Sequence, residues 1–234
     1  MPSSPGHRVR RSPNIWDNPA TYEIENNAVD RAGLLTRTMR SLGDWAGRDV
    51  LDVGCGTGFH LPLFAADAAT VTGVEPHPPL AAIARRRVRR LGNVTVHEAG
   101  AAALPLPDAS VDVAHARWAY FFGPGAEPGL RELDRVVRPG GTAFVIDNDP
   151  TTSTFGAWFA RGFPDVDPAA VETFWTGLGW NRERLLVDWQ CDSRADFEAV
   201  VRIELPTAVA EQVLAEQPDA TSVDYAVNLW WRHF

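Results

Sequence analysis

The chain has 234 residues, of which 45% are apolar and 22% are charged, and its formal net charge is −8. This composition is typical of a globular protein with one sizeable core, and it excludes a fibrous or wholly disordered chain. The negative charge repels polyanions, so neither nucleic acid nor an anionic membrane is an expected partner. We expect a small molecule, neutral or cationic, as the partner instead.

The cysteine count and the N-terminus indicate a cytoplasmic protein. Cys55 and Cys191 are too few for a disulfide framework. Residues 1–13 are rich in Pro, Ser and Arg and lack the apolar core of a signal peptide, so we expect a flexible tail there. No stretch reaches the roughly 20 apolar residues that cross a bilayer. The six histidines are scattered and no Cys-x-x-Cys occurs, so we expect no metal.

The first two thirds of the sequence alternate between helical and strand-like segments. Residues 14–48 form a leading cap, in which apolar positions at helical spacing predict one amphipathic helix over 14–42. Short β-branched runs then predict five strands, and the segments between them have helical length. Strands that alternate with helices imply a parallel sheet that is buried on both faces. The expected strands are 49–53, 70–74, 94–97, 111–114 and 142–146, and the expected helices are 59–66, 79–91 and 128–137.

The last third, residues 150–234, has a different pattern. Helices are expected over 169–178, 196–201 and 207–216, and strands over 185–190 and 223–231. Six of the nine tryptophans lie here, and they fill either the core or an aromatic substrate pocket. We expect one domain over 14–234, in which 49–149 binds a cofactor and 150–234 shapes the acceptor site.

A glycine-rich turn follows the first expected strand. Residues 50–58 read VLDVGCGTG, so Gly54, Gly56 and Gly58 lie where the strand gives way to a helix. Glycines let the backbone at such a turn contact a ligand directly. Glu75, seventeen residues after Gly58 and at the end of the second strand, is placed to accept both hydroxyls of a ribose. The spacing GxGxG differs from the GxGxxG of dinucleotide sites, so a nucleoside without pyrophosphate is expected.

Three motifs in order resemble the class I S-adenosylmethionine-dependent methyltransferases. The glycine turn resembles motif I of that family, residues 104–113 (LPLPDASVDV) resemble its LPFPD…SFDVV segment, and residues 135–141 (RVVRPGG) resemble its RVLKPGG turn. The likeness covers about residues 22–149. It implies an α/β fold with a doubly wound, mostly parallel, Rossmann-like sheet of seven strands, the last antiparallel. It also implies S-adenosyl-L-methionine as cofactor and S-adenosyl-L-homocysteine as product.

The resemblance assigns cofactor-binding roles to positions of this chain. Asp52 holds the glycine turn, Glu75 binds the ribose and Pro76 covers the adenine. The family's acidic residue near the adenine amino group is replaced by Gly100, and Glu98 is the nearby carboxylate that could substitute. The remaining positions implied in cofactor binding are Gly54, Cys55, Gly56, Gly58, Gly100, Ala101 and, through its carbonyl, Ala116, with Tyr22 closing over the cofactor.

The sequence offers few candidate catalytic residues for the methyl-transfer step. Ligands of such sheets bind at the carboxyl ends of the strands, which makes His60, His115, Asp147 and Asp149 the candidates for catalysis. His60 and Asp149 are the preferred two, and His115 is expected to line the cofactor. Each has a plain structural alternative, such as a local hydrogen bond or a helix cap. Aromatic residues after the fourth strand face either an acceptor or the core: Trp118, Tyr120, Phe121 and Phe122.

The sequence therefore predicts methyl transfer to a small-molecule acceptor, at an oxygen, nitrogen or carbon atom. Two alternatives stay open, because the motifs describe the cofactor site and hardly the acceptor. The same cofactor could serve an elimination or a cyclisation, or the chain could bind it without catalysis. The basic run at 85–90 is expected to be a solvated helix face, and the oligomeric state is not indicated.

Overall fold

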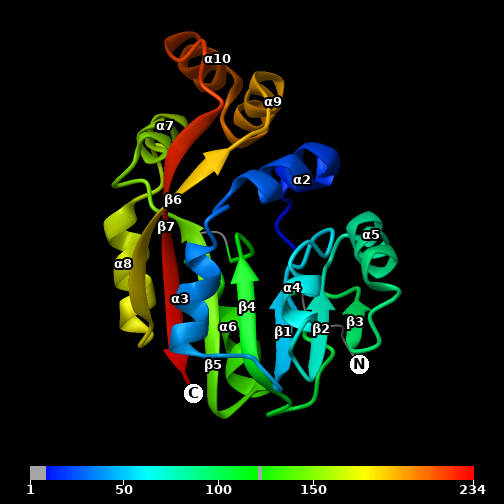
Figure 1. Cartoon of the computed structure of the whole chain (residues 1–234). Coiled ribbons are helices and arrows are strands. Elements are labelled where there is room, and N and C mark those ends of the chain that lie inside the picture. Colours follow the sequence, from blue (N-terminus) through cyan, green and yellow to red (C-terminus); the bar gives the residue numbers. More distant parts are fainter. Residues whose placement is uncertain (1–8, 121–122) are drawn as a thin grey trace, which may run out of the picture.

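The computed structural model describes residues 9–120 and 123–234, which form a seven-stranded sheet with helices on both faces (Figure 1). The strand order is β3-β2-β1-β4-β5-β7-β6. The first three strands match the expected ranges, and the later ones are longer than expected. The strands are β1 Asp49–Val53, β2 Thr70–Val74, β3 Val94–His97, β4 Val111–Arg117, β5 Val137–Asn148, β6 Asn181–Gln190 and β7 Ser222–His233.

The strand directions confirm the predicted mixed sheet. β1 pairs in parallel with β2 and β4, β2 with β3, and β4 with β5. The last strand, β7, is inserted between β5 and β6 and runs antiparallel to both. The carboxyl ends of β1, β2, β4 and β5 therefore meet at one edge, where ligands of open α/β sheets bind.

The helices agree with the expected ones except at two places. The described helices are α1 Pro13–Asp17, α2 Pro19–Ala28, α3 Leu34–Leu42, α4 Leu61–Ala65, α5 Pro78–Val88, α6 Glu127–Val136, α7 Thr154–Gly162, α8 Pro168–Gly177, α9 Arg194–Glu204 and α10 Thr207–Glu216. The sequence pattern missed α7. Its start is marked by Ser153, whose hydroxyl accepts the N–H of Gly156 at 3.0 Å, as an N-cap does.

The single helix expected over 14–42 is wrong, because three helices occupy that range. Asn18 leaves the helical region since Pro19 follows it, which separates α1 from α2. Val29 is extended and forms an antiparallel bridge with Trp189 of β6, and Gly33 takes a positive φ of 72° before α3. The helical periodicity was continuous across these breaks, so only the Pro and Gly positions could have indicated them.

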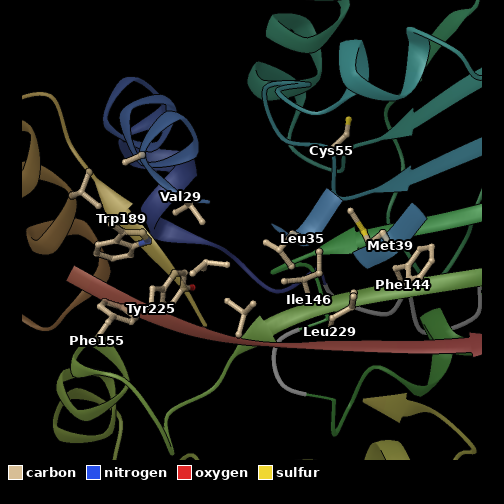
Figure 2. Close-up of a cluster of buried hydrophobic side chains, with 14 of the residues drawn as sticks. Val29, Leu35, Met39, Cys55, Phe144, Ile146, Phe155, Trp189, Tyr225 and Leu229 are labelled. Atoms are coloured by element: carbon tan, nitrogen blue, oxygen red, sulfur yellow. The ribbon is translucent and has the colours of Figure 1, made fainter. Parts of the chain in front are cut away.

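Alternating strand residues supply two cores, one on each face of the sheet. Val50, Phe144 and Ile146 face the core that α2, α3 and α9 cover, whereas Leu51 and Val145 face α6 and α8. Figure 2 shows part of the first core, in which Trp189, Tyr225 and Phe155 pack together near Val29, the residue that follows α2. Of the six late tryptophans, five are buried, at 158, 175, 180, 189 and 230, and none of the six lines the main cavity.

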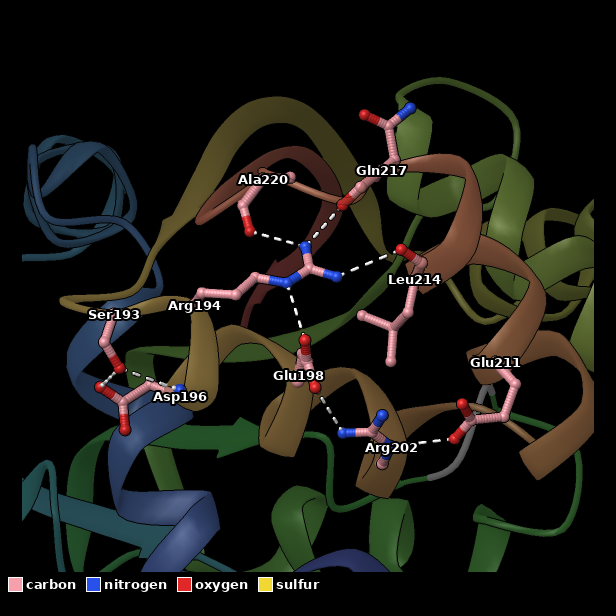
Figure 3. Close-up of polar contacts among 9 residues, drawn as sticks. All are labelled: Ser193, Arg194, Asp196, Glu198, Arg202, Glu211, Leu214, Gln217 and Ala220. Atoms are coloured by element: carbon pink, nitrogen blue, oxygen red, sulfur yellow. Dashed lines mark hydrogen bonds and ion pairs between the residues drawn. The ribbon is translucent and has the colours of Figure 1, made fainter.

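Arg194 at the start of α9 fixes the C-terminal helices (Figure 3). Its guanidinium donates to the carbonyls of Leu214, Gln217 and Ala220 at 3.1, 2.5 and 2.8 Å, and its Nε donates to Glu198 at 2.9 Å. These carbonyls lie at and beyond the end of α10, where helix carbonyls lack partners within the helix. These bonds join α9 to the end of α10, and α2 packs against α9.

Within the described ranges, no helix is both long enough and apolar enough to cross a membrane.

Candidate functional site

The glycine turn after β1 brings backbone close to other parts of the chain. Gly54 and Gly56 have φ angles of +71° and +56°, in the left-handed region that favours glycine. A Cβ at Gly54 would lie 2.7 Å from the Cβ of Ala119, and one at Gly56 would lie 2.7 Å from Cδ1 of Ile15. The turn is held because the carbonyl of Val74 accepts the N–H of Gly54 at 2.8 Å. Any side chain at these two positions would collide with Ala119 or Ile15.

Glu75 lies directly against this turn. It follows β2 and is only 4% exposed, and its Oε2 accepts the N–H of Gly56 at 3.0 Å. Its Oε1 accepts the N–H of His77 at 2.8 Å. Burial raises the pKa of the Glu75 carboxyl, and the two N–H groups oppose that rise. A carboxylate is therefore fixed beside the glycine turn.

A cavity of about 670 Å³ opens over the turn and Glu75. Its lining includes Asp52, the glycine turn, Pro76 and residues 100–103, together with His60, Arg117, Trp118 and Tyr120. Residues of α1 and α2 close it from above: Ile15, Trp16, Tyr22 and Asn26. Figure 1 shows α2 lying across the carboxyl ends of the strands, between α5 and α9. We call α1 and α2 the roof of the cavity.

The roof is attached to the first half of the sheet by one stack and one polar cluster. The rings of Trp16 and His77 stack at 4.2 Å, with 7° between their planes. Glu23 forms an ion pair with Arg87 of α5 at 2.5 Å and accepts a hydrogen bond from the hydroxyl of Thr57. These contacts connect the roof to α5 and to the glycine turn.

The roof is attached to the C-terminal helices through Glu204 of α9. Asn14 donates to Glu204 Oε1 at 2.5 Å, and the carboxyl of Glu25 shares a hydrogen bond with that of Glu204. Two carboxyl groups can share a hydrogen bond only if at least one keeps its proton. Burial raises the pKa of both, that of Glu204 to about 7.

Most of the residues that the sequence singled out meet in the cavity. Gly58, Ala116 and Asp149 do not line it, and Phe121 and Phe122 lie outside the described residues. The proposed substitute carboxylate, Glu98, is exposed and away from the lining. The predicted residues that do line the cavity are Tyr22, Asp52, Gly54, Cys55, Gly56, His60, Glu75, Pro76, Gly100, Ala101, Trp118 and Tyr120.

The two candidate catalytic residues have different surroundings. Asp149 accepts hydrogen bonds from the backbone and hydroxyl of Thr151 at 2.9 and 2.5 Å, which is a turn-forming arrangement. His60 lines the cavity, and burial together with the nearby charge of Arg117 lowers its pKa well below the usual value. His60 is therefore neutral at pH 7. The neighbouring His115 is buried and its Nδ1 is 2.8 Å from Asp52 Oδ1.

Sequence reasoning missed several residues of the cavity. Val9, Arg10 and Ser12, expected to be a loose tail, line it, as do Ile15 and Trp16 of α1. Pro13 and Pro19 at the first positions of α1 and α2 were the available signal, because proline there marks a helix start. The further lining residues that were not predicted are Asn26, Val53, Thr57, Phe59, Ala102, Ala103, Arg117, Ala119 and several between 124 and 129.

Comparison with known proteins identifies the family. A model of the methyltransferase domain matches residues 51–145. The phosphatidylethanolamine N-methyltransferase of Cereibacter sphaeroides is 32% identical over 196 residues, which are 80% of this chain and 87% of that protein. The demethylmenaquinone methyltransferase of Tropheryma whipplei (strain Twist) is 35% identical over 108 residues, 46% of this chain and 45% of that protein.

The chain spans about half the length of several of the curated relatives that it matches. Among solved structures, the [4+2]-cyclase SpnF shares the fold with a TM-score of 0.59 and 22% identity, covering 86% of this chain and 81% of that one. The glycine turn, the strand order and these relatives lead to one conclusion. The chain belongs to the class I S-adenosylmethionine-dependent methyltransferase family.

Proposed function

We propose that the chain transfers the methyl group of S-adenosylmethionine to a small organic acceptor that enters beneath the roof. The observation that supports this most is that Glu75 and the glycine turn line the same cavity as His60 and Trp118. A cofactor bound against Glu75 and the glycine turn would share this cavity with an acceptor beside His60 and Trp118. Methyl transfer needs the two reactants aligned about 3 Å apart, and a shared cavity provides for that.

The residues present fit the cofactor. Gly54 and Gly56 line the cavity, which suits direct contact of their backbone with the methionine part, and the Glu75 carboxylate suits the two ribose hydroxyls. Pro76 and the segment 100–101 line the place proposed for the adenine. When bound, S-adenosylmethionine supplies an electrophilic methyl group on a sulfonium.

The protein's own part in the reaction is to position the acceptor and to exclude water. Phe59, Trp118 and Tyr120 offer apolar surface to an acceptor skeleton. We propose His60 rather than Asp149 beside the acceptor, because only His60 lines the cavity. Its lowered pKa keeps the ring neutral, so it can accept a hydrogen bond from an acceptor hydroxyl or amine.

Calorimetric titration of the purified protein with S-adenosylhomocysteine and NAD tests the proposal. We expect micromolar binding of S-adenosylhomocysteine and none of NAD. Glu75→Ala removes two charge-assisted hydrogen bonds, each worth about 1.5–3 kcal/mol, so its affinity should fall at least about 100-fold. Glu98→Ala, at an exposed acid outside the cavity, is the matched control and should bind normally.

Binding of NAD alone, or equal affinities for the Glu75 and Glu98 variants, would contradict the proposed site. Mass spectrometry of an acceptor library incubated with S-adenosylmethionine then distinguishes the reactions. A product heavier by one methyl group supports transfer, whereas a rearranged product of unchanged mass indicates a cyclisation.

A further inference from the structure

Arg117, the last residue of β4, places a guanidinium on the wall of the cavity. Its Cζ lies 4.3 Å from the centre of the Trp118 ring, and its Nη1 is 3.4 Å from Nε2 of His60, a long contact with a neutral ring. The Nε and Nη2 atoms are shielded from water and have no hydrogen-bond partner among the described residues. Two donors of a buried cation are thus left without acceptors.

The nearby acidic groups do not supply the missing partner. Within the described parts of the chain, no carboxylate lies within 4.0 Å of the Arg117 guanidinium. Glu25 shares a hydrogen bond with Glu204, and burial raises the pKa of both carboxyls. Asp30 accepts the backbone N–H groups of Leu34 and Leu35, each at 2.8 Å, at the start of α3.

The phenols around Arg117 are neutral as well. Burial raises the pKa of Tyr22 and Tyr225 above the usual value, so neither forms a phenolate near neutral pH. The hydroxyl of Tyr225 donates to Asn148, and Trp118 Nε1 donates to the same oxygen at 2.7 Å. The polar groups around the guanidinium are therefore either occupied or uncharged.

The geometry of the two free donors points to an oxyanion. Nε and Nη2 lie on one edge of the planar guanidinium, and this edge matches the two oxygens of a carboxylate. Burial lowers the pKa of Arg117 but an arginine remains charged in a protein, so an anion gains both charge and hydrogen bonds here. The aromatic ring of Trp118 beside it suits a flat skeleton that carries the anion.

We propose that Arg117 is the oxyanion-binding residue of the cavity, and that the side chains covering its Nε–Nη2 edge give way to a carboxylate. Two sources share this chemistry. One is an acidic group on the acceptor, and the other is the methionine carboxylate of the cofactor; both assignments rest on the proposed function. Binding of a free aromatic carboxylate to Arg117 does not depend on the proposed function, so the proposed function and the role of Arg117 can be refuted separately.

The test compares Arg117→Gln with wild type in calorimetric titrations of two ligand pairs. The first pair is S-adenosylhomocysteine and 5′-methylthioadenosine, which keeps the nucleoside and thioether but lacks the amino-acid carboxylate. The second pair is 2-naphthoate and its neutral amide, each titrated with and without S-adenosylhomocysteine. Arg31→Gln, at an ion pair with Asp192 outside the cavity, is the matched control. Circular dichroism verifies that the variants fold.

We expect Arg117→Gln to lose about tenfold in affinity for one carboxylate ligand and nothing for its neutral counterpart. Loss for 2-naphthoate alone assigns the anion to the acceptor, and loss for S-adenosylhomocysteine alone assigns it to the cofactor. A folded variant that binds all four ligands as wild type does would overturn the proposal. A wild-type protein that binds neither nucleoside refutes the proposed function, while the naphthoate pair still decides the role of Arg117.

Discussion

The carboxyl pair Glu25–Glu204 predicts an unusual dependence of stability on pH. The two carboxyls form a buried contact between the roof and α9 in which they share a proton. The folded-state pKa of each is raised, that of Glu204 to about 7. An acid with a raised folded pKa stabilises the fold fully below its unfolded pKa, here near 4.5, and this stabilisation is lost as the pH rises through the folded value. The pair therefore weakens the protein between about pH 4.5 and 7.

The size of the effect follows from proton linkage. Each proton that the folded state retains and the unfolded state has lost changes the free energy of unfolding by about 1.4 kcal/mol per pH unit at most. Removing the titration of Glu204 with Glu204→Gln keeps an acceptor for Asn14 and Glu25. From pH 5 to 7 the free energy of unfolding of the variant should rise relative to that of wild type, by up to about 3 kcal/mol, and the difference should level off above pH 7.

Urea unfolding followed by tryptophan fluorescence at pH 5, 6, 7 and 8 measures this difference. Glu211→Gln is the control, because Glu211 lies on α10 and forms an exposed ion pair with Arg202 at 3.0 Å. If the free energies of Glu204→Gln and wild type differ by the same amount at all four pH values, the two carboxyls do not share a proton and the reasoning is refuted.

Three further predictions concern packing. Gly58→Ala should lower the free energy of unfolding by about 1–3 kcal/mol, because Gly58 has a φ of +76° and a Cβ there would lie 3.1 Å from the backbone of α5. Gly92→Ala is the control and should leave the free energy of unfolding unchanged, because the space around Gly92 is open. Trp175→Ala should cost about 3–5 kcal/mol in urea unfolding, since this side chain is fully buried. Trp16→Ala should remove the stack on His77 and weaken S-adenosylhomocysteine binding about two- to tenfold in calorimetry; an unchanged affinity would show that this stack does not hold the roof.

The sheet could be predicted from sequence because its strands are short apolar runs bounded by glycine and proline. The expected ranges of β1, β2 and β3 match the structure, and those of β5 and β7 were too short. β5 extends because it continues through the turn at 139–141, where proline and glycine suggested a break. The three N-terminal helices were predicted as one, because the spacing of their apolar residues continues across Asn18 and Val29, where the helices in fact end.

The part of the candidate site proposed for the cofactor could be predicted as a cavity lining because its residues are contiguous, from Asp52 to Thr57, with Glu75 at a fixed distance. The acceptor half could not, because it is assembled from segments far apart in the chain. Ile15 and Arg117, more than a hundred residues apart, line the same cavity because α1 lies over the glycine turn. The negative net charge favoured a neutral or cationic partner, whereas Arg117 places a positive charge on the wall of the cavity, where it attracts an anion.

The bridge between Val29 and Trp189 has a consequence for ligand exchange. Together with the bond from the Asp30 N–H to the Asp188 carbonyl at 3.0 Å, it pins the end of α2 to the sheet. The end of α2 is therefore held by backbone bonds to the sheet, whereas α1 is held by side-chain contacts, the Trp16–His77 stack and the Asn14–Glu204 hydrogen bond. We therefore expect Trp16→Ala to loosen α1 without detaching α2, and to speed the release of S-adenosylhomocysteine more than it slows its capture.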